Sequence, residues 1–534
     1  MAFKSFHRLQ DFFLILFSSS LLVLSFPKFD LGFLCWGGLL PLLIAIYGKS
    51  LRDAFLYSLV CGLFFFVGLF SWILSFPGFT FLQQAALFLY LACYFGFFGL
   101  AFNFICTRWS LTSVLWAAPF VWISLEYIRS NLSFLALPWG LLAHSQYKYP
   151  MFIQIASIAG TYSISFLIVM ANSALAALVL PAARSLKPQG IPERKVLVSA
   201  ATVFIALALF YGHWILSLAI KGDPVRISVV QGNIDQSKKW DPSYARAIMQ
   251  TYAELTQEAA KDRPSLIIWP ETASPGAINQ DIRLYMEVKN IAEKAGTYIL
   301  LGSSQHQKFE TKGGKEFKYL NSAYLIYPDP KIARTQRYDK IILFPFGEYL
   351  PFKEFIPWPY FGVPNISEYV PGREFTVFKL PDSLVGVTIC WENVFPDLAR
   401  QFVKCGAQFM INITNEAWFG KSAAPYQLVA ISVFRAVENR IFWVRCANTG
   451  VSCIIDPCGR IIARVQDDKG EDTFIRGMKS GWVIPLHSNT IYNRCGDLLI
   501  WVAFIGSALF IVVAWRKGHR SISWGRTDEK KGCA

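Results

Sequence analysis

Charged residues are scarce in this chain. Only 16% of its 534 residues are Asp, Glu, Lys or Arg, whereas soluble proteins carry about a quarter. Hydrophobic residues make up 54% of the sequence, aromatic residues 16%, and mean hydropathy is positive at +0.37. The deficit excludes an ordinary soluble protein and indicates a membrane protein.

Histidine and paired cysteine motifs are also lacking. The six histidines are scattered, and the eleven cysteines contain no CxxC pair or other metal-ligand spacing. Four cysteines lie within apolar runs, where cysteine acts as a small hydrophobic residue. We therefore expect no metal and no other cofactor. A disulfide is left open among five later cysteines, namely Cys405, Cys446, Cys453, Cys458 and Cys495.

The net charge of +15 does not indicate nucleic-acid binding. Basic residues lie in short loops between apolar runs and in the tail "WRKGHRSISWGRTDEKKGCA". The positive-inside rule predicts this distribution in a membrane protein. We therefore expect both termini in the cytoplasm, with no nucleic acid as a partner.

Eight apolar runs approach the length of about 20 residues that a membrane-spanning helix needs. They lie near 9–27, 31–48, 53–77, 80–106, 111–128, 153–182, 196–219 and 496–515. The sequence thus predicts a seven-helix membrane region over 1–222, an inserted domain over 223–490, and an eighth helix with a basic tail over 491–534. Seven crossings would put the inserted domain on the far side of the membrane.

The sequence pattern of the inserted block is typical of an α/β domain. Short β-rich runs such as "VRISVVQGN", "SLIIWPET", "TYILLGSS", "SAYLIYP", "GVTICWEN" and "AQFMINITNE" alternate with amphipathic helical stretches. The turn 456–459 joins two further alternating strands into a hairpin. Helices covering a sheet are the expected architecture.

Three polar residues lie at the edges of apolar strands in this block. Cys390 ends the run "VGVTIC", before a segment that can start a helix whose N–H groups would favour a thiolate. Glu271 ends "SLIIWPE", and Lys340 precedes the apolar part of "RYDKIILFPFGEYLPF". Alone, each has an ordinary explanation: a buried cysteine, a helix cap and a solvated lysine. Together, they suggest a thiol nucleophile, its base and an oxyanion-stabilising cation.

These segments resemble the carbon–nitrogen hydrolase (nitrilase) superfamily. "WPE", "YDK", "CWE", "NITNEAWFG", "RAVENR" and "NTG" match its signatures in order. The opening "VVQGNIDQSKKWD" and the loop "LPWGLLAHSQ", together with the apolar runs, further resemble the bacterial apolipoprotein N-acyltransferases. This resemblance implies a membrane-helix bundle with an αββα sandwich on the periplasmic side of the inner membrane.

The resemblance also implies an activity. Members move an acyl chain from a phospholipid to the α-amine of a diacylglyceryl-cysteine at a lipoprotein N-terminus, through a cysteine thioester. It makes Cys390 the nucleophile, Glu271 the base and Lys340 the oxyanion stabiliser. Supporting residues would be Trp240, Glu348, Trp391 and Glu392, with Trp391 standing where better-known members have tyrosine.

Other features carry alternatives. Asn415 and Glu416 either line the pocket or cap a turn, and the helical spacing of Arg435, Glu438 and Arg440 suggests a structural ion pair. The aromatic loop, residues 344–372, is either a lipid-facing cover of the site or an ordinary packed loop.

Competing functions are a membrane-tethered nitrilase or amidase for a small amide, which one span would anchor, and a transporter. Transporters usually have charged or broken spans in paired halves, which these almost charge-free runs do not resemble. A monomer is expected because the site lies within one chain.

Overall fold

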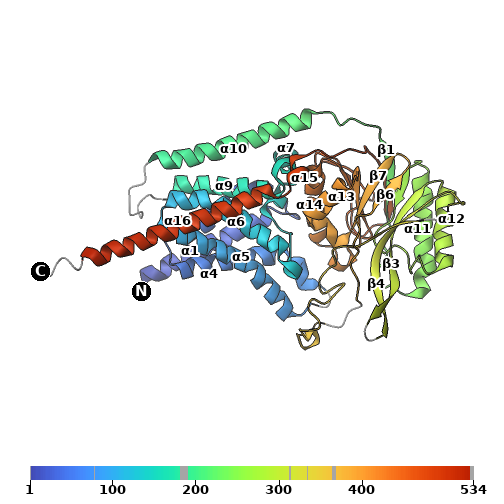
Figure 1. Cartoon of the computed structure of the whole chain (residues 1–534), viewed down its shortest axis with the longest axis horizontal. Coiled ribbons are helices and arrows are strands. Elements are labelled where there is room, and N and C mark those ends of the chain that lie inside the picture. Colours follow the sequence, from blue (N-terminus) through green and yellow to red (C-terminus); the bar gives the residue numbers. More distant parts are fainter. Residues whose placement is uncertain are drawn as a thin grey trace. The chain divides into compact units, whose positions relative to one another are not determined.

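The computed structural model describes residues 2–76, 79–180, 191–311, 314–332, 335–361, 363 and 368–528. It divides into two compact units. One comprises Met1–Leu216 with Asp497–Ala534, and the other is Ser217–Gly496. The first unit is helical, and the second combines helices with sheets (Figure 1).

The first unit contains the long apolar helices. Six helices among the described residues are long and apolar enough to cross a membrane. They are α4 (Leu51–Leu69), α5 (Phe81–Arg108), α6 (Leu111–Asn131), α9 (Tyr162–Val179), α10 (Ile191–Ser217) and α16 (Leu498–Asp528). Ser50 caps α4, and Thr80 and Gln83 form a capping box at α5, so local sequence signals define both starts.

The predicted count of eight spans is not confirmed. The run 9–27 gives α1 (Ala2–Leu24), whose apolar part Leu9–Leu24 is short of the span length. The run 31–48 breaks into three pieces where glycines and a proline interrupt it. The run 153–182 also divides, because Gly160 takes a positive φ before α9. The shorter pieces are η1 (Gly32–Leu34), α2 (Cys35–Gly38), α3 (Leu40–Ile46), α7 (Pro150–Ile153) and α8 (Ala156–Ala159).

The loop "LPWGLLAHSQ" is fastened to α6 by two buried charged side chains. Arg129 donates to the main-chain oxygens of Leu137 and Trp139, at 3.0 and 2.7 Å. Glu126 accepts from the main-chain nitrogen of Leu142 at 3.0 Å. Charged residues in this span therefore satisfy a loop main chain that would otherwise lose its hydrogen bonds.

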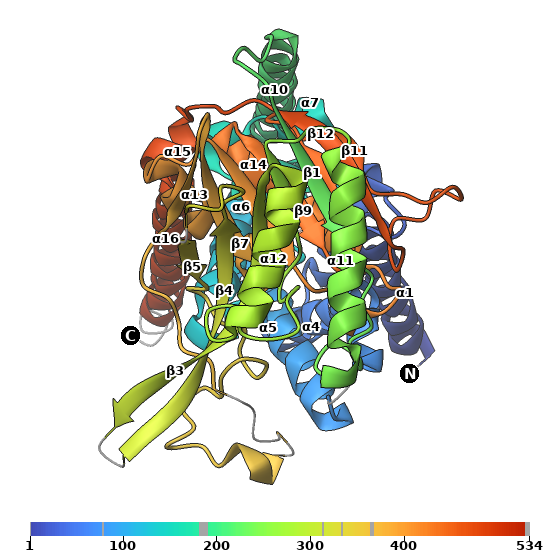
Figure 2. The ribbon, with the colours of Figure 1, turned by 90° about the vertical axis from the view of Figure 1, so that its right-hand side faces the viewer.

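The second unit is a two-sheet sandwich. One sheet has the order β12-β1-β2-β3-β4-β5 and the other β11-β10-β9-β8-β7-β6. Helices α11 (Ala245–Ala260) and α12 (Ile282–Ala295) lie side by side over the first sheet (Figure 2). Helices α13 (Pro396–Lys404) and α14 (Ala424–Asn439) pack on the second. The αββα architecture predicted for this block is confirmed.

The described strands overlap the predicted β-rich runs except at 336–339, 377–380 and 477–483, which the sequence did not predict. They are β1 (Val225–Gln231), β2 (Leu266–Ile268), β3 (Tyr298–Thr311), β4 (Gly314–Ile326), β5 (Gln336–Asp339), β6 (Val377–Leu380), β7 (Ser383–Ile389), β8 (Phe409–Thr414), β9 (Phe442–Ala447), β10 (Cys453–Ile455), β11 (Ile461–Arg464) and β12 (Gly477–Val483). The predicted hairpin is the antiparallel pair β10–β11.

Each sheet has a parallel centre. Strands β1, β2 and β3 run parallel, as do β7, β8 and β9. Their near-continuous apolar runs are typical of strands covered on both faces. Parallel strands bring their carboxyl ends to one edge, where ligand sites of α/β sheets lie. Glu271, Cys390 and Asn415 all follow such ends.

Candidate active site

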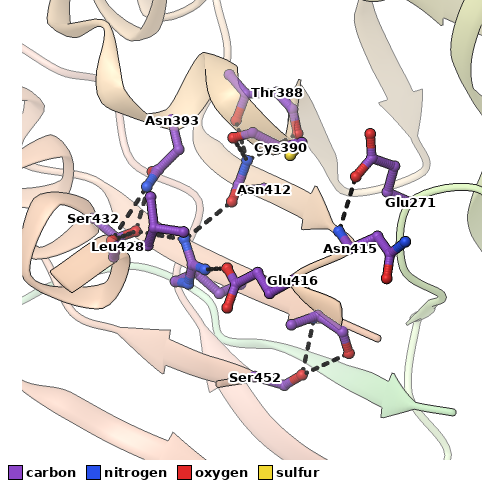
Figure 3. Close-up of polar contacts among 12 residues, drawn as sticks. Glu271, Thr388, Cys390, Asn393, Asn412, Asn415, Glu416, Leu428, Ser432 and Ser452 are labelled. Atoms are coloured by element: carbon purple, nitrogen blue, oxygen red, sulfur yellow. Dashed lines mark hydrogen bonds and ion pairs between the residues drawn. The ribbon is translucent and has the colours of Figure 1, made fainter. Parts of the chain in front are cut away.

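Cys390 occupies a sharp turn at the end of β7. Its φ is +52°, in the left-handed region that residues with a side chain rarely adopt. Asn412 of β8 holds this turn, because its Nδ2 donates to the main-chain oxygens of Thr388 and Cys390, at 3.3 and 3.4 Å, and to the Thr388 hydroxyl at 3.2 Å (Figure 3). The neighbouring strand therefore fixes the main chain that carries the thiol.

A buried polar network supports Asn412. Arg445 of β9 donates to Asn412 Oδ1 and to Ser432 Oγ, both at 3.1 Å, and pairs with Glu416. Arg445 and Glu416 are fully buried. Breaking such a pair on one side leaves an uncompensated buried charge, so its members are mutually dependent. Glu416 thus belongs to the support behind the site, and its side chain makes no capping hydrogen bond to the turn that follows it.

Glu271 is oriented by two donors from different strands. Its Oε1 accepts from Asn321 Nδ2 at 2.8 Å. Its Oε2 accepts from the main-chain nitrogen of Asn415, also at 2.8 Å (Figure 3). Gly302 of β3 lies against this turn, since a Cβ there would be 2.5 Å from the Thr272 nitrogen. Close main-chain packing therefore fixes the strand end beneath the carboxylate.

Lys340 follows β5 and is buried in an ion pair with Glu348. Its Nζ lies 2.9 Å from Glu348 Oε1 and 2.8 Å from Oε2. Asn321 Nδ2 also donates to Glu348 Oε1 at 3.1 Å, so one amide bridges the carboxylates of Glu348 and Glu271. Burial opposes charge on Lys340, but Glu348, a Cys390 thiolate and Glu271 outweigh it and raise the lysine pKa.

Glu392 connects the turn after Lys340 to strand β7. Its Oε1 accepts from the main-chain nitrogens of Ile341 and Ile342, at 2.6 and 3.0 Å, and from the Tyr338 hydroxyl at 2.7 Å. Its Oε2 accepts from the Ile389 nitrogen at 2.8 Å. Burial raises its pKa to about 7, against these donors. Glu392 therefore holds the segments that carry Lys340 and Cys390.

The two predicted tryptophans differ in exposure. Trp391 is buried and makes edge-to-face contacts with Phe344 and Phe395, at centroid distances of 5.1 and 5.7 Å. Trp240 is 52% exposed on the loop after β1. Trp391 thus packs under the start of the aromatic loop, whereas Trp240 is accessible to another molecule.

Asn415 contributes more than a turn cap. Besides its main-chain bond to Glu271, its Nδ2 donates to Gln236 Oε1 at 2.7 Å. Asn448, in "NTG", donates to Asn415 Oδ1 at 3.1 Å. Asn415 therefore connects the carboxylate of Glu271 to the loop that carries Trp240.

The thiol of Cys390 is not pre-ionised. Burial, followed by the nearby Glu271 carboxylate, raises its pKa to about 12, against the lowering effect of Lys340. The prediction that helix-terminal N–H groups favour a thiolate is thus wrong for the free site. The reason is local: a 3-10 turn, η7 (Cys390–Val394), follows the cysteine, and α13 begins only at Pro396. A base must remove the proton.

Two further sequence alternatives are resolved. Arg435 and Glu438 form a buried ion pair at 3.0 Å, as the structural interpretation predicted. The five cysteines among which a disulfide was left open are free thiols, as are all other cysteines that the structure describes. Over the described ranges, no group of three or more His, Cys, Asp or Glu side chains could hold a metal ion.

Several site residues were not predicted. Asn321 and Arg445 lie in no quoted signature, and Asn412 opens "NITNEAWFG" without having been singled out; each acts on a residue far away in sequence. The available signal was polarity inside apolar strands: "MINIT" and "FWVRCA" each place a polar or charged residue among buried neighbours. Such residues need partners when buried.

Comparison with known proteins assigns both units. Residues 226–483 match the carbon–nitrogen hydrolase family, and residues 18–174 match the apolipoprotein N-acyltransferase N-terminal domain. The chain is 34% identical over 515 residues to the apolipoprotein N-acyltransferase of Geobacter metallireducens, covering 95% of this chain and 96% of that one. The chain belongs to the apolipoprotein N-acyltransferase family.

Other members and a solved structure are also similar. The apolipoprotein N-acyltransferase of Chlorobaculum tepidum is 30% identical over 538 residues, 95% of this chain and 97% of that one. Saccharomyces cerevisiae Nit3, of the nitrilase superfamily, is 20% identical over 50% of this chain and 93% of its own, with a TM-score of 0.36. As a member of the apolipoprotein N-acyltransferase family, the protein is a membrane acyltransferase with a carbon–nitrogen hydrolase domain.

Proposed function

We propose that the protein transfers a fatty acyl chain from a membrane phospholipid to the α-amine of the diacylglyceryl-cysteine of apolipoproteins. One observation carries the proposal: a thiol, a carboxylate and an ammonium meet at the strand ends of a carbon–nitrogen hydrolase domain, in a chain whose described residues include six long apolar helices. Both substrates are lipids, and their chains bind the bilayer with about 0.8 kcal/mol per buried methylene. An enzyme for them belongs in the membrane.

The first half-reaction loads the enzyme. Glu271 takes the proton from Cys390 Sγ as the sulfur attacks the carbonyl carbon of the phospholipid ester. The carbonyl oxygen becomes an oxyanion, which Lys340 stabilises. The carbon–oxygen ester bond then breaks, and the lysophospholipid alkoxide takes the proton from Glu271. An acyl thioester on Cys390 remains.

The second half-reaction unloads it. The lipoprotein α-amine attacks the thioester carbonyl, and Glu271 accepts a proton from the nitrogen. The carbon–sulfur bond breaks, the amide forms, and the Cys390 thiolate recovers its proton. Water has to be kept out during this interval, because it would hydrolyse the thioester.

Some supporting residues hold the reacting groups in place, and others provide contacts for the substrate. Glu348 and Glu392 hold the ammonium and the turn that carries Lys340, and Asn415 holds the base. Trp391 provides an apolar wall under the aromatic loop, and Trp240 provides an exposed ring for a substrate. No metal or other cofactor takes part in either half-reaction.

The aromatic loop is the lipid-facing cover of the site. Within its described part, Phe355 is 83% exposed and Tyr360 89% exposed, and Phe352 and Phe361 are also exposed. Residues 362 and 364–367 of this loop lie outside the described residues. Exposed aromatic rings suit the interface between water and lipid. The domain would work as a monomer on the periplasmic side of the bacterial inner membrane, with both termini in the cytoplasm.

A transfer assay tests this function. The purified protein would be incubated in vesicles of phospholipid with isotope-labelled acyl chains, together with a diacylglyceryl-cysteine peptide. Labelled acyl amide on the peptide, formed by wild type and absent with Cys390→Ala, is the expected product. An unmodified peptide, together with hydrolysis of small amides by the same preparation, would instead identify an amidase.

A further inference from the structure

A second lysine, which the two half-reactions leave unused, is buried beside the catalytic base. Lys239 lies on the loop after β1, and its side chain is only 4% exposed, while its neighbours Lys238 and Trp240 are exposed. Burying an ammonium is costly unless it gains partners. The position therefore needs a specific explanation.

The hydrogen bond of Lys239 joins it directly to the proposed catalytic base. Its Nζ donates to the main-chain oxygen of Glu271 at 3.0 Å, the one hydrogen bond that this ammonium makes among the described residues. Lys289, another buried lysine of this unit, donates to three main-chain oxygens, those of Tyr327, Asp329 and Ile332, at 2.8, 2.5 and 3.0 Å. Lys289 has the contacts of a purely structural lysine, whereas Lys239 does not.

The charges facing Lys239 are those of the reaction. Burial lowers its pKa to about 8, and the opposing effects come from Glu271, after β2, and from Cys390, after β7. Lys340 faces the same two groups, but Glu348 already neutralises it. Lys239 forms no ion pair in the part of the chain that the structure describes. No paired carboxylate therefore neutralises its charge, as Glu348 neutralises that of Lys340.

We propose that Lys239 is a positioning residue for acyl transfer, which holds Glu271 in place through its main-chain oxygen and ties the base to the loop carrying Trp240. The loop has a second tie of the same kind, since Gln236 accepts from Asn415, whose nitrogen binds Glu271. The base and a substrate-contacting residue would then move together. This inference rests on the proposed function.

The charge of Lys239 predicts a specific pH dependence of the acylation rate. A lysine whose folded pKa lies below its unfolded value loses its proton first in the folded protein. Above about pH 8 the ammonium becomes a neutral amine, which is a weaker donor. The hold on Glu271 should therefore weaken, and acylation should slow, as pH rises through this range.

The test measures single-turnover formation of the acyl-enzyme between about pH 6 and about pH 10. Substrate is phospholipid in vesicles, and the proteins are wild type, Lys239→Met, Lys239→Arg, the exposed neighbour Lys238→Met and the structural Lys289→Met. Lys239→Met should lower the rate at saturating phospholipid by about 100-fold, because small displacements of a catalytic group cost this much. Its lipid concentration for half-maximal rate should stay within about twofold.

The pH profile separates positioning from stability. Lys239→Arg should keep activity at alkaline pH where wild type declines, because arginine stays charged. Lys238→Met should match wild type, and Lys289→Met should lower the unfolding temperature without moving the profile. If Lys239→Met fails to fold, the comparison of the pH profiles of Lys239→Arg and wild type still tests the inference.

Two results would overturn the inference: a Lys239→Met enzyme with the wild-type rate, or a Lys239→Arg profile identical to that of wild type. Failure of the proposed function looks different. In that case wild type itself would form no acyl-enzyme at any pH.

Discussion

At the scale of single residues, the nucleophile is held in place before it is activated. Cys390 has a positive φ that Asn412 supports from the adjacent strand, yet its thiol is kept neutral by burial and by Glu271. A neutral thiol is a weaker nucleophile than a thiolate, so the free site holds the less reactive form. In the proposed mechanism, activation would then depend on proton transfer to Glu271 and on the charge of Lys340.

The protonation of Cys390 can be measured directly. With its pKa raised to about 12, the ultraviolet thiolate signal in the difference between wild type and Cys390→Ser should be absent at neutral pH and appear only in strongly alkaline solution. Glu271→Gln should shift this titration to lower pH, since a like charge is removed. It should nevertheless slow acylation by about 100-fold or more, because the base is gone. A thiolate titrating near neutrality in wild type would contradict this scheme.

The support behind Cys390 makes a separate prediction. Asn412→Asp keeps an acceptor for Arg445 but loses the amide donor to the main chain of Thr388 and Cys390. The acylation rate should fall by about 100-fold, while the unfolding temperature changes little. Equal acylation by Asn412→Asp and wild type would show that the turn holds its shape without this donor.

The proposed reacting groups were visible in the sequence, whereas several of the residues that contact them were not. Resemblance and strand-end position both indicated Glu271, Lys340 and Cys390, and the structure brings their side chains to one place. Asn321 and Lys239 were missed because their contacts join separate strands and loops, and no local spacing encodes them. The thiolate prediction was wrong because burial and the Glu271 carboxylate raise the pKa of Cys390, and no α-helix begins at the cysteine.

At the scale of elements, long apolar runs and parallel strands were predictable, and edges were not. Central strands such as β7 and β8 are mostly apolar and almost entirely buried, and they were recognised from their apolar runs. The edge strands β5, β6 and β12 are partly exposed and mix polar with apolar residues, so no clear period marks them. The predicted count of eight membrane helices was not confirmed, because glycines and prolines divide some of the apolar runs into shorter helices.

The aromatic loop offers a test at this scale. Phe355→Ser and Tyr360→Ser should reduce transfer from phospholipid vesicles several-fold with little change in unfolding temperature, because both rings are exposed and contribute little to the core. Phe317→Ser is the matched control, since that phenylalanine is an exposed ring on β4 of the same unit. Equal loss in all three variants, or none in any, would assign the loop an ordinary packing role.

At the scale of the whole molecule, the account makes a statement about membrane sides. Six long apolar helices among the described residues and a 34% identical family member make the chain a membrane acyltransferase. The distribution of basic residues further predicts that the second unit faces the periplasm. A periplasmic site would meet lipoproteins after export, when their N-terminal cysteine carries its diacylglyceryl group.

Two native cysteines report the side of the second unit. Cys405 and Cys495 are exposed free thiols within it. In intact spheroplasts, a membrane-impermeant maleimide should label wild type, and a variant with both cysteines replaced by serine should lose that labelling. Labelling that appears only after the membrane is permeabilised would place the unit in the cytoplasm.

The central claim is that Cys390 carries the acyl chain between two lipid substrates. Intact mass spectrometry of folded wild type and Cys390→Ala, each incubated with phospholipid, tests it most directly. The account predicts a fatty-acyl mass increment on wild type alone, which a diacylglyceryl-cysteine peptide then removes. An increment that persists in Cys390→Ala, or its absence from folded wild type, would contradict the thioester mechanism.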